Sequence, residues 1–134
     1  MLPTSTIVAF DVGARRIGVA ISRSGIVAEP LTTLDATADG ADEQLRSLIQ
    51  RAAPTVIVVG EPVRIGSRTT VIHSFLAQLQ SILDPSVKII TVDETLTTKE
   101  AERLSRPGTD TDALAACLIL EQYLAETGST NHES

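Results

Sequence analysis

The sequence predicts an α/β fold in which a mixed five-stranded sheet carries helices on both faces, and three observations lead to this fold. The first 34 residues hold three β-rich apolar runs and no helical spacing. From residue 39 onward, short apolar runs alternate with segments of helical spacing. Thr55–Val59 is apolar almost throughout, which is typical of a central strand covered on both faces. Meandering strands followed by alternating strands and helices give a layered α/β domain.

The opening runs predict an antiparallel meander. Thr6–Val12 and Ile17–Ser22 are expected as the first two strands, and the short link Gly13–Arg16 reads as a hairpin turn. Ile26–Leu34 is predicted as the third strand.

The rest of the chain predicts helices in alternation with two further strands, Thr55–Val59 and Val87–Val92. The helices are indicated by apolar stripes at helical spacing and by capping residues, and they are Asp39–Ala52, Ser67–Leu83, a short helix opening at Thr97–Glu100, and Thr111–Glu126. Right-handed crossovers place the fourth strand beside the first, with the fifth outside it.

Length and composition predict one domain over residues 1–127 and a flexible tail over residues 128–134. A chain of 134 residues can bury one core but cannot form two lobes around a cleft. No apolar run approaches the roughly 18 residues of a membrane helix and no signal peptide opens the chain, so we expect a cytoplasmic protein without membrane contact. Cys117 is the single cysteine, which excludes an intrachain disulfide, and its apolar surroundings predict a core position.

Charge and aromatic content limit how the chain can bind nucleic acid. The net charge of −6 argues against a general polyanion binder, and only three residues are aromatic, so base stacking is not the expected mode. The basic residues lie apart from the acidic stretch 35–43, which leaves either a basic edge or ordinary surface charge. As nucleic-acid contacts we predict Arg15, Arg16, Arg64, Arg68, Lys99, Arg103 and Arg106.

Acidic residues stand at the ends of several predicted strands. Asp11 lies near the end of the first strand, Glu61 follows the fourth, and Asp93 and Glu94 follow the fifth. Because ligand sites in open α/β sheets lie beyond the carboxyl ends of the strands, we expect these acids at one edge. Asp112 lies in the first turn of the last helix, and alanines on its helical face would let that helix approach the sheet.

Gathered carboxylates predict a metal site, because they repel one another unless cations lie between them. Oxygen ligands with open positions suit Mg²⁺ or Mn²⁺, and two such ions can activate water and stabilise the leaving oxygen of a phosphodiester. We predict that Asp11, Glu61, Glu94 and Asp112 are metal ligands and catalytic residues. Taken singly, Asp112 could instead complement the helix dipole, and Glu61 could be a surface residue.

Several sequence blocks also resemble the YqgF/RuvX family of Holliday-junction-resolvase-like proteins or pre-16S rRNA nucleases. In chain order they are FDVGARRIGVAIS, Pro30-Leu31, VIVVGEPV, VDETLTTKEAERL and TDALAACLILEQYL, and the resemblance extends from Ile7 to about Leu124. It implies an RNase H-like fold and a metal-dependent nuclease. Asp11 and Asp112 match the family's acidic positions, and Glu94 matches the glutamate of its Asp-Glu-Arg motif. Two roles are implied, maturation of the 5′ end of 16S rRNA and resolution of branched DNA, and the resemblance does not choose between them.

The chain departs from the family pattern in three places. The usual Gly-Leu-Pro reads Gly60-Glu61-Pro62, which adds a carboxylate. The usual Asp-Glu-Arg reads Asp93-Glu94-Thr95, which loses a cation, and the basic loop before the last aspartate is reduced to residues 106–110. Fewer contacts from Lys and Arg to phosphates predict weaker binding with a flatter salt dependence.

Two other functions fit parts of the sequence. A non-catalytic nucleic-acid-binding or regulatory protein with this fold would explain the net acidity and the shortened basic loop. An actin-like or sugar-kinase ATPase has a phosphate-binding turn similar to residues 11–20, but it needs two such domains to enclose a nucleotide. The nuclease interpretation predicts structured RNA or branched DNA as partner, and a monomer or a weak homodimer.

Overall fold

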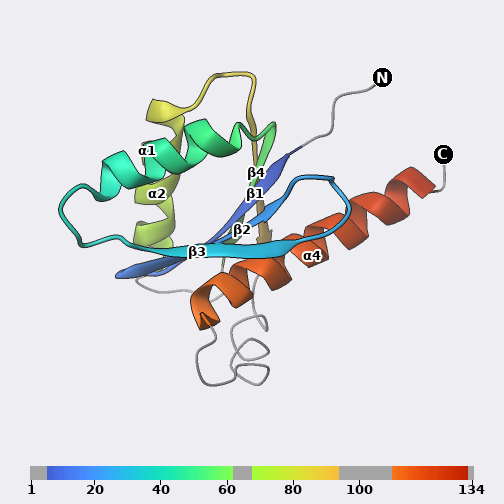
Figure 1. Cartoon of the computed structure of the whole chain (residues 1–134), viewed down its shortest axis with the longest axis horizontal. Coiled ribbons are helices and arrows are strands. Elements are labelled where there is room, and N and C mark those ends of the chain that lie inside the picture. The colour runs from blue at the N-terminus through green and yellow to red at the C-terminus, as the bar shows by residue number, and fades with distance from the viewer. Residues whose placement is uncertain (1–5, 62–67, 94–109, 133–134) are drawn as a thin grey trace.

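A computed structural model of the chain describes residues 6–61, 68–93 and 110–132. Five strands form one mixed sheet in the order β3-β2-β1-β4-β5 (Figure 1). The strands are β1 (Ile7–Val12), β2 (Arg16–Ser22), β3 (Glu29–Asp35), β4 (Val56–Glu61) and β5 (Lys88–Asp93). The first three pair antiparallel, and β4 and β5 continue the sheet in parallel pairing from β1. The predicted meander and the predicted place of the fourth strand beside the first are confirmed.

Helices cover both faces of this sheet, as predicted. The helices α1 (Ala41–Ala52) and α2 (Arg68–Ile82) lie on one face, and α4 (Thr111–His132) crosses the other (Figure 1). Each face has its own apolar cluster, and in the first of them the rings of Phe10 and Phe75 meet edge to face with centroids 5.1 Å apart. No helix among the described residues is both long and apolar enough to cross a membrane.

The alternation of β1 places its residues on the two faces. Val8, Phe10 and Val12 pack into the cluster under α1 and α2, whereas Ile7 and Ala9 pack into the cluster under α4. Since successive side chains of a strand point to opposite faces, the side chain of Asp11 belongs to the face that α4 crosses.

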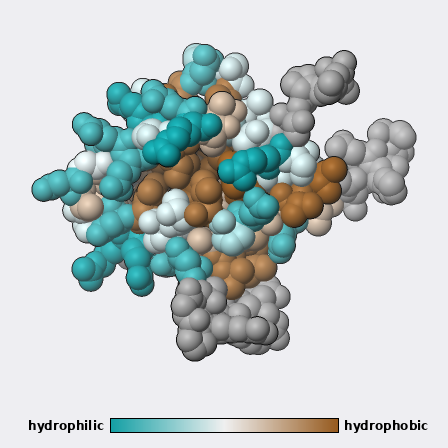
Figure 2. Space-filling model, in the orientation of Figure 1, coloured by the Kyte–Doolittle hydropathy of each residue, from teal (hydrophilic) through white to brown (hydrophobic). Residues whose placement is uncertain are grey.

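The third strand begins later than predicted, at Glu29 rather than Ile26. Serine hydroxyls take the backbone amides that a strand would use in its ladder: Ser24 Oγ accepts from the amides of Ile26 and Val27, at 3.0 and 3.2 Å. Ile26 and Val27 are therefore left in the β2–β3 connection, 77% and 62% exposed, where Figure 2 shows an apolar surface patch. The apolar run alone did not reveal that a serine hydroxyl competes with strand pairing for these backbone amides.

The last helix runs further than predicted, to His132 rather than Glu126. The stretch 127–132 contains no proline, and a single glycine inside a helix costs only about 1 kcal/mol, so the helix can pass Gly128. The other described helices and strands begin and end within two residues of their predicted bounds. The short helix predicted at Thr97–Glu100 lies outside the described residues.

Candidate active site

Asp11 is the buried acid of the sheet. It is 9% exposed and lies on the central strand β1, where its register partners are Gly18 of β2 and Gly60 of β4. Its Oδ1 atom is buried and has no hydrogen-bond partner among the described residues. Leaving a buried polar group without a partner costs about 1–3 kcal/mol, and more for a charged group. Within the described residues nothing compensates the burial of this atom, and a bound ligand would do so.

Asp112 reaches the same place from the helix. A Cβ atom built on Gly18 would lie 1.9 Å from the carbonyl oxygen of Asp112, so the first turn of α4 rests directly on the backbone of β2. Because Gly18 is the register partner of Asp11, this contact brings Asp112 alongside the strand pair that carries Asp11. The closeness expected from small residues on α4 is present, with Ala113, Ala115 and Ala116 buried, although the decisive small residue is Gly18.

Asp110 fixes the beginning of α4. Its Oδ1 atom accepts a hydrogen bond from the Ala113 amide at 3.1 Å, which is the geometry of a helix N-cap, and another from the Thr33 hydroxyl at 2.5 Å. The cap thus ties the first turn of α4 to β3. Sequence reasoning missed both residues as determinants of the site. An aspartate three residues before Ala113 was the available signal for the cap, whereas nothing in the sequence indicated Thr33.

Arg16 forms an ion pair with Asp112, with Nε 3.2 Å from Oδ2. The Arg16 side chain is 70% exposed and that of Asp112 is 34% exposed. An exposed pair of this kind contributes about 0.2–1 kcal/mol. The arginine predicted to contact nucleic acid therefore contacts a predicted catalytic acid.

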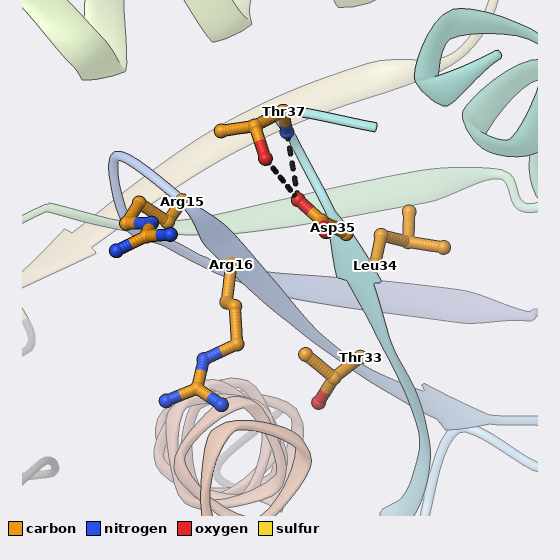
Figure 3. A pocket seen from close by; sticks show the side chains of 6 residues that line it. All are labelled: Arg15, Arg16, Thr33, Leu34, Asp35 and Thr37. Carbon is orange, nitrogen blue, oxygen red and sulfur yellow. Dashed lines mark hydrogen bonds between the residues drawn. The ribbon is translucent and has the colours of Figure 1, made fainter. Parts of the chain in front are cut away.

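A pocket of about 440 Å³ opens beside this ion pair. It is lined by Arg15, Arg16, Thr33, Leu34, Asp35 and Thr37 (Figure 3). Asp35 accepts hydrogen bonds from the hydroxyl and the amide of Thr37, at 2.6 and 2.9 Å. These two bonds, helped by the charge of Arg15, hold the pKa of Asp35 below its usual value. The pocket wall thus combines two guanidinium groups with a carboxylate that Thr37 already engages.

The other predicted site residues are only partly described. Glu61 is the last residue of β4 and pairs with Asp93 of β5 rather than with Asp11, and its side chain lies outside the described part. Arg68 begins α2, again without a described side chain. Five further predicted residues fall in segments that the structure does not describe, namely Arg64, Glu94, Lys99, Arg103 and Arg106.

Asp11 and Asp112 present the oxygen ligands that Mg²⁺ and Mn²⁺ prefer. Within residues 6–61, 68–93 and 110–132 no group of three or more His, Cys, Asp or Glu side chains could hold an ion. The buried Asp11 Oδ1 atom, for which the described ranges supply no partner, fits a cation at this position. The described acids therefore form part of a possible donor set, and Glu61 and Glu94 are the predicted remainder.

Cys117 has the core role that the sequence predicted. Its side chain is 5% exposed on the sheet-facing side of α4. Burial, with smaller contributions from Glu121 and Glu29, raises the pKa of its thiol to about 11. The thiol is therefore protonated near neutral pH and is a poor nucleophile.

The fold and the acids together define the class of the protein. An antiparallel meander extended by two parallel strands, with an aspartate on the central strand and another on the helix across it, is an RNase H-like arrangement. Two solved structures share the fold. The chain matches Thermus thermophilus RuvC in complex with a Holliday junction substrate with a TM-score of 0.56 and 13% identity, over 92% of this chain and 96% of that one. It matches the fowlpox virus resolvase in complex with Holliday junction DNA with a TM-score of 0.59 and 14% identity, over 91% and 98%.

Sequence comparison gives the family. Residues 5–126 match the model of the family described as RuvX, Holliday junction resolvase, and the chain belongs to this family. Among its relatives, a Roseiflexus protein is 36% identical over 88% of this chain and 92% of its own length. A Mycoplasma capricolum protein is 37% identical over 90% of this chain and 96% of its own length. Both carry the name "Putative pre-16S rRNA nuclease". The resemblance stated from the sequence blocks is thus confirmed.

Proposed function

We propose that the protein is a metal-dependent nuclease that hydrolyses phosphodiester bonds of structured nucleic acid. The observation that carries the proposal is the buried Asp11 Oδ1 atom, which has no hydrogen-bond partner in the described part of the chain and lies next to the helix turn that holds Asp112. Membership of a resolvase family supports the reaction type. The ions proposed are Mg²⁺ or Mn²⁺, held by Asp11 and Asp112 together with Glu94, Glu61 or both.

The ions would supply an activated water and would stabilise the leaving oxygen of the phosphodiester. The protein's part is to hold ligands in place. Asp11 is fixed on a central strand, and Asp112 is fixed by the Gly18 contact and by the Asp110 cap. Among the described residues the buried thiol of Cys117 is no competent nucleophile, so we propose hydrolysis without a covalent enzyme intermediate.

Nucleic acid is the proposed partner, and the exposed Arg15, which lines the pocket together with Arg16, is proposed to contact its phosphates. Arg64, Arg68, Lys99, Arg103 and Arg106 are proposed as further contacts. The names of the family and of its relatives point to Holliday junctions and to pre-16S rRNA, and we propose one or the other as the substrate of this chain. A cytoplasmic location and a monomeric or weakly dimeric state complete the proposal.

A cleavage assay tests the proposal directly. A synthetic four-way DNA junction and an RNA spanning the 5′ end of 16S rRNA are incubated with the protein and Mn²⁺, with and without excess EDTA. We expect cleavage of at least one substrate, its loss in EDTA and its loss in Asp11→Asn. Asp39→Asn, which changes an exposed acid in the loop before α1, is the matched control and should cleave normally.

Two outcomes would contradict the proposal. Cleavage in excess EDTA by protein free of contaminating nucleases would exclude metal-dependent hydrolysis. Tight binding of either substrate with no cleavage in Mg²⁺ or Mn²⁺ would favour the non-catalytic binding protein. The Arg16–Asp112 ion pair favours that second function, because it partly neutralises Asp112 without a metal.

A further inference from the structure

Arg16 lies between two binding places. Its Nε atom is 3.2 Å from Asp112 Oδ2, and its side chain also lines the pocket that contains Arg15. In Figure 3 the guanidinium of Arg16 extends toward α4, while that of Arg15 points in another direction, away from Asp35 and Thr33. One guanidinium is therefore shared by an acid of the site and by a pocket that a phosphate could enter.

The ion pair and a metal ion compete for Asp112. A divalent cation bound by the same carboxylate would repel the guanidinium and would offer Asp112 a stronger electrostatic partner. Arg16 is largely exposed and Asp112 is about one-third exposed, so solvent screens the pair and its loss costs little. Arg16 can therefore act as the counter-ion of Asp112 without preventing a metal from binding there.

A displaced Arg16 would remain beside the pocket. The pocket would then offer the guanidinium groups of both Arg15 and Arg16, while Asp35 on its wall keeps the two hydrogen bonds from Thr37. Guanidinium groups bind phosphate oxygens through paired N–H donors. The volume of about 440 Å³ leaves room for a backbone phosphate with part of its sugar.

We infer that Arg16 couples metal binding to phosphate binding: it pairs with Asp112 in the metal-free protein, and a divalent ion releases it to bind a backbone phosphate of the nucleic acid beside Arg15. This inference rests on the proposed metal-dependent function. It makes Arg16 a switch between two partners rather than a permanent phosphate contact. Because binding energies are reciprocal, phosphate in the pocket should also strengthen metal binding.

Calorimetric titration with Mn²⁺, without nucleic acid, tests the competition. We expect Arg16→Gln to bind Mn²⁺ about two- to fivefold more tightly than wild type, which is the affinity that an exposed ion pair withholds. Arg15→Gln removes the neighbouring charge and leaves the Asp112 pair intact, so its affinity should change less. An affinity of Arg16→Gln equal to or weaker than that of Arg15→Gln would overturn the inference.

Nuclear magnetic resonance of isotope-labelled arginine side chains tests the release. In EDTA the Arg16 Nε–H signal should differ from that of an exposed arginine, and it should move toward the exposed position when Mg²⁺ is added. Inorganic phosphate should then shift it at lower concentration in Mg²⁺ than in EDTA. An Arg16 signal that ignores Mg²⁺ in a protein shown to bind it would refute the switch and leave the nuclease proposal standing. Failure of wild-type protein to bind Mg²⁺ or Mn²⁺ would refute both.

Discussion

Gly18 and Asp112 meet backbone to backbone, with no space between them for even a methyl group. The carbonyl carbon and oxygen of Asp112 would lie 2.3 and 1.9 Å from a Cβ on Gly18. Neither group is the movable end of a side chain, so a substitution must shift either the helix or the strand. The placement of Asp112 over the register partner of Asp11 therefore depends on a glycine that carries no chemistry itself.

Gly18→Ala should displace the first turn of α4 and separate Asp112 from Asp11. Overpacking of this kind typically costs about 1–3 kcal/mol, so we expect a lower free energy of unfolding in urea, together with loss of cleavage. Gly40→Asn is the control, because no atom lies within 4 Å of the added Cβ and asparagine tolerates the positive φ of +83° there. Wild-type stability and activity for Gly18→Ala would show that the helix does not need this close contact.

Asp11→Asn should stabilise the metal-free protein while abolishing cleavage. A neutral amide is less costly to bury without a partner than a carboxylate, so we expect a higher melting temperature in EDTA than for wild type. Added Mg²⁺ should raise the melting temperature of wild type and should have little effect on Asp11→Asn, since a ligand stabilises only the state that binds it. A variant that melts below wild type in EDTA would show that the carboxylate has a structural partner.

Cys117 predicts a pH dependence of stability. Its folded pKa of about 11 lies above the ordinary thiol value of 9.0, so folding favours the protonated thiol. The unfolded chain loses this proton first, and the free energy of unfolding should fall as the pH rises from about 9 through about 11, by roughly 1.4 kcal/mol per unit at most. Cys117→Ala should lack this part of the decline. Parallel stability curves for wild type and variant over that range would contradict the burial argument.

The strands were predictable from sequence because their information is local. Thr55–Val59 is apolar enough to indicate a central strand, and Asp11 stands out because an acid ends an apolar run. The β2–β3 connection was not predictable in the same way. Its apolar residues predict strand pairing, but the amides of Ile26 and Val27 donate to Ser24 Oγ instead. The local hydrophobic pattern therefore predicted the strands of the sheet, but it did not reveal the Ser24 contacts that shorten β3.

The contacts that place Asp112 join residues far apart in the chain. Gly18 contacts Asp112, and Thr33 binds Asp110 across 77 positions. The Arg16–Asp112 pair is of the same kind, which is why Arg16 was expected only as a phosphate contact. Sequence spacing could nominate the acids, but it could not tell which distant residues position or neutralise them.

Glu61 and Glu94 compete for the role of third ligand, and two matched substitutions separate them. Glu61 ends β4, the strand beside β1, but it pairs with Asp93 while Gly60 pairs with Asp11. Glu94 follows Asp93 directly and matches the glutamate of the family motif. We propose that Glu61→Gln and Glu94→Gln have different effects. The variant that removes the true ligand should lose Mn²⁺ affinity and cleavage together.

For a ligand, replacing the carboxylate by an amide should lower the Mn²⁺ affinity and the cleavage rate by at least about tenfold, a loss of about 1.4 kcal/mol in binding. The unfolding free energy in EDTA should change by less than about 0.5 kcal/mol, as for a surface substitution. An unchanged Glu61→Gln beside an inactive Glu94→Gln would assign the role to Glu94 alone, and the reverse would assign it to Glu61. If both variants bind Mn²⁺ and cleave like wild type, Asp11 and Asp112 hold the ions without either glutamate, and the proposed ligand set is wrong.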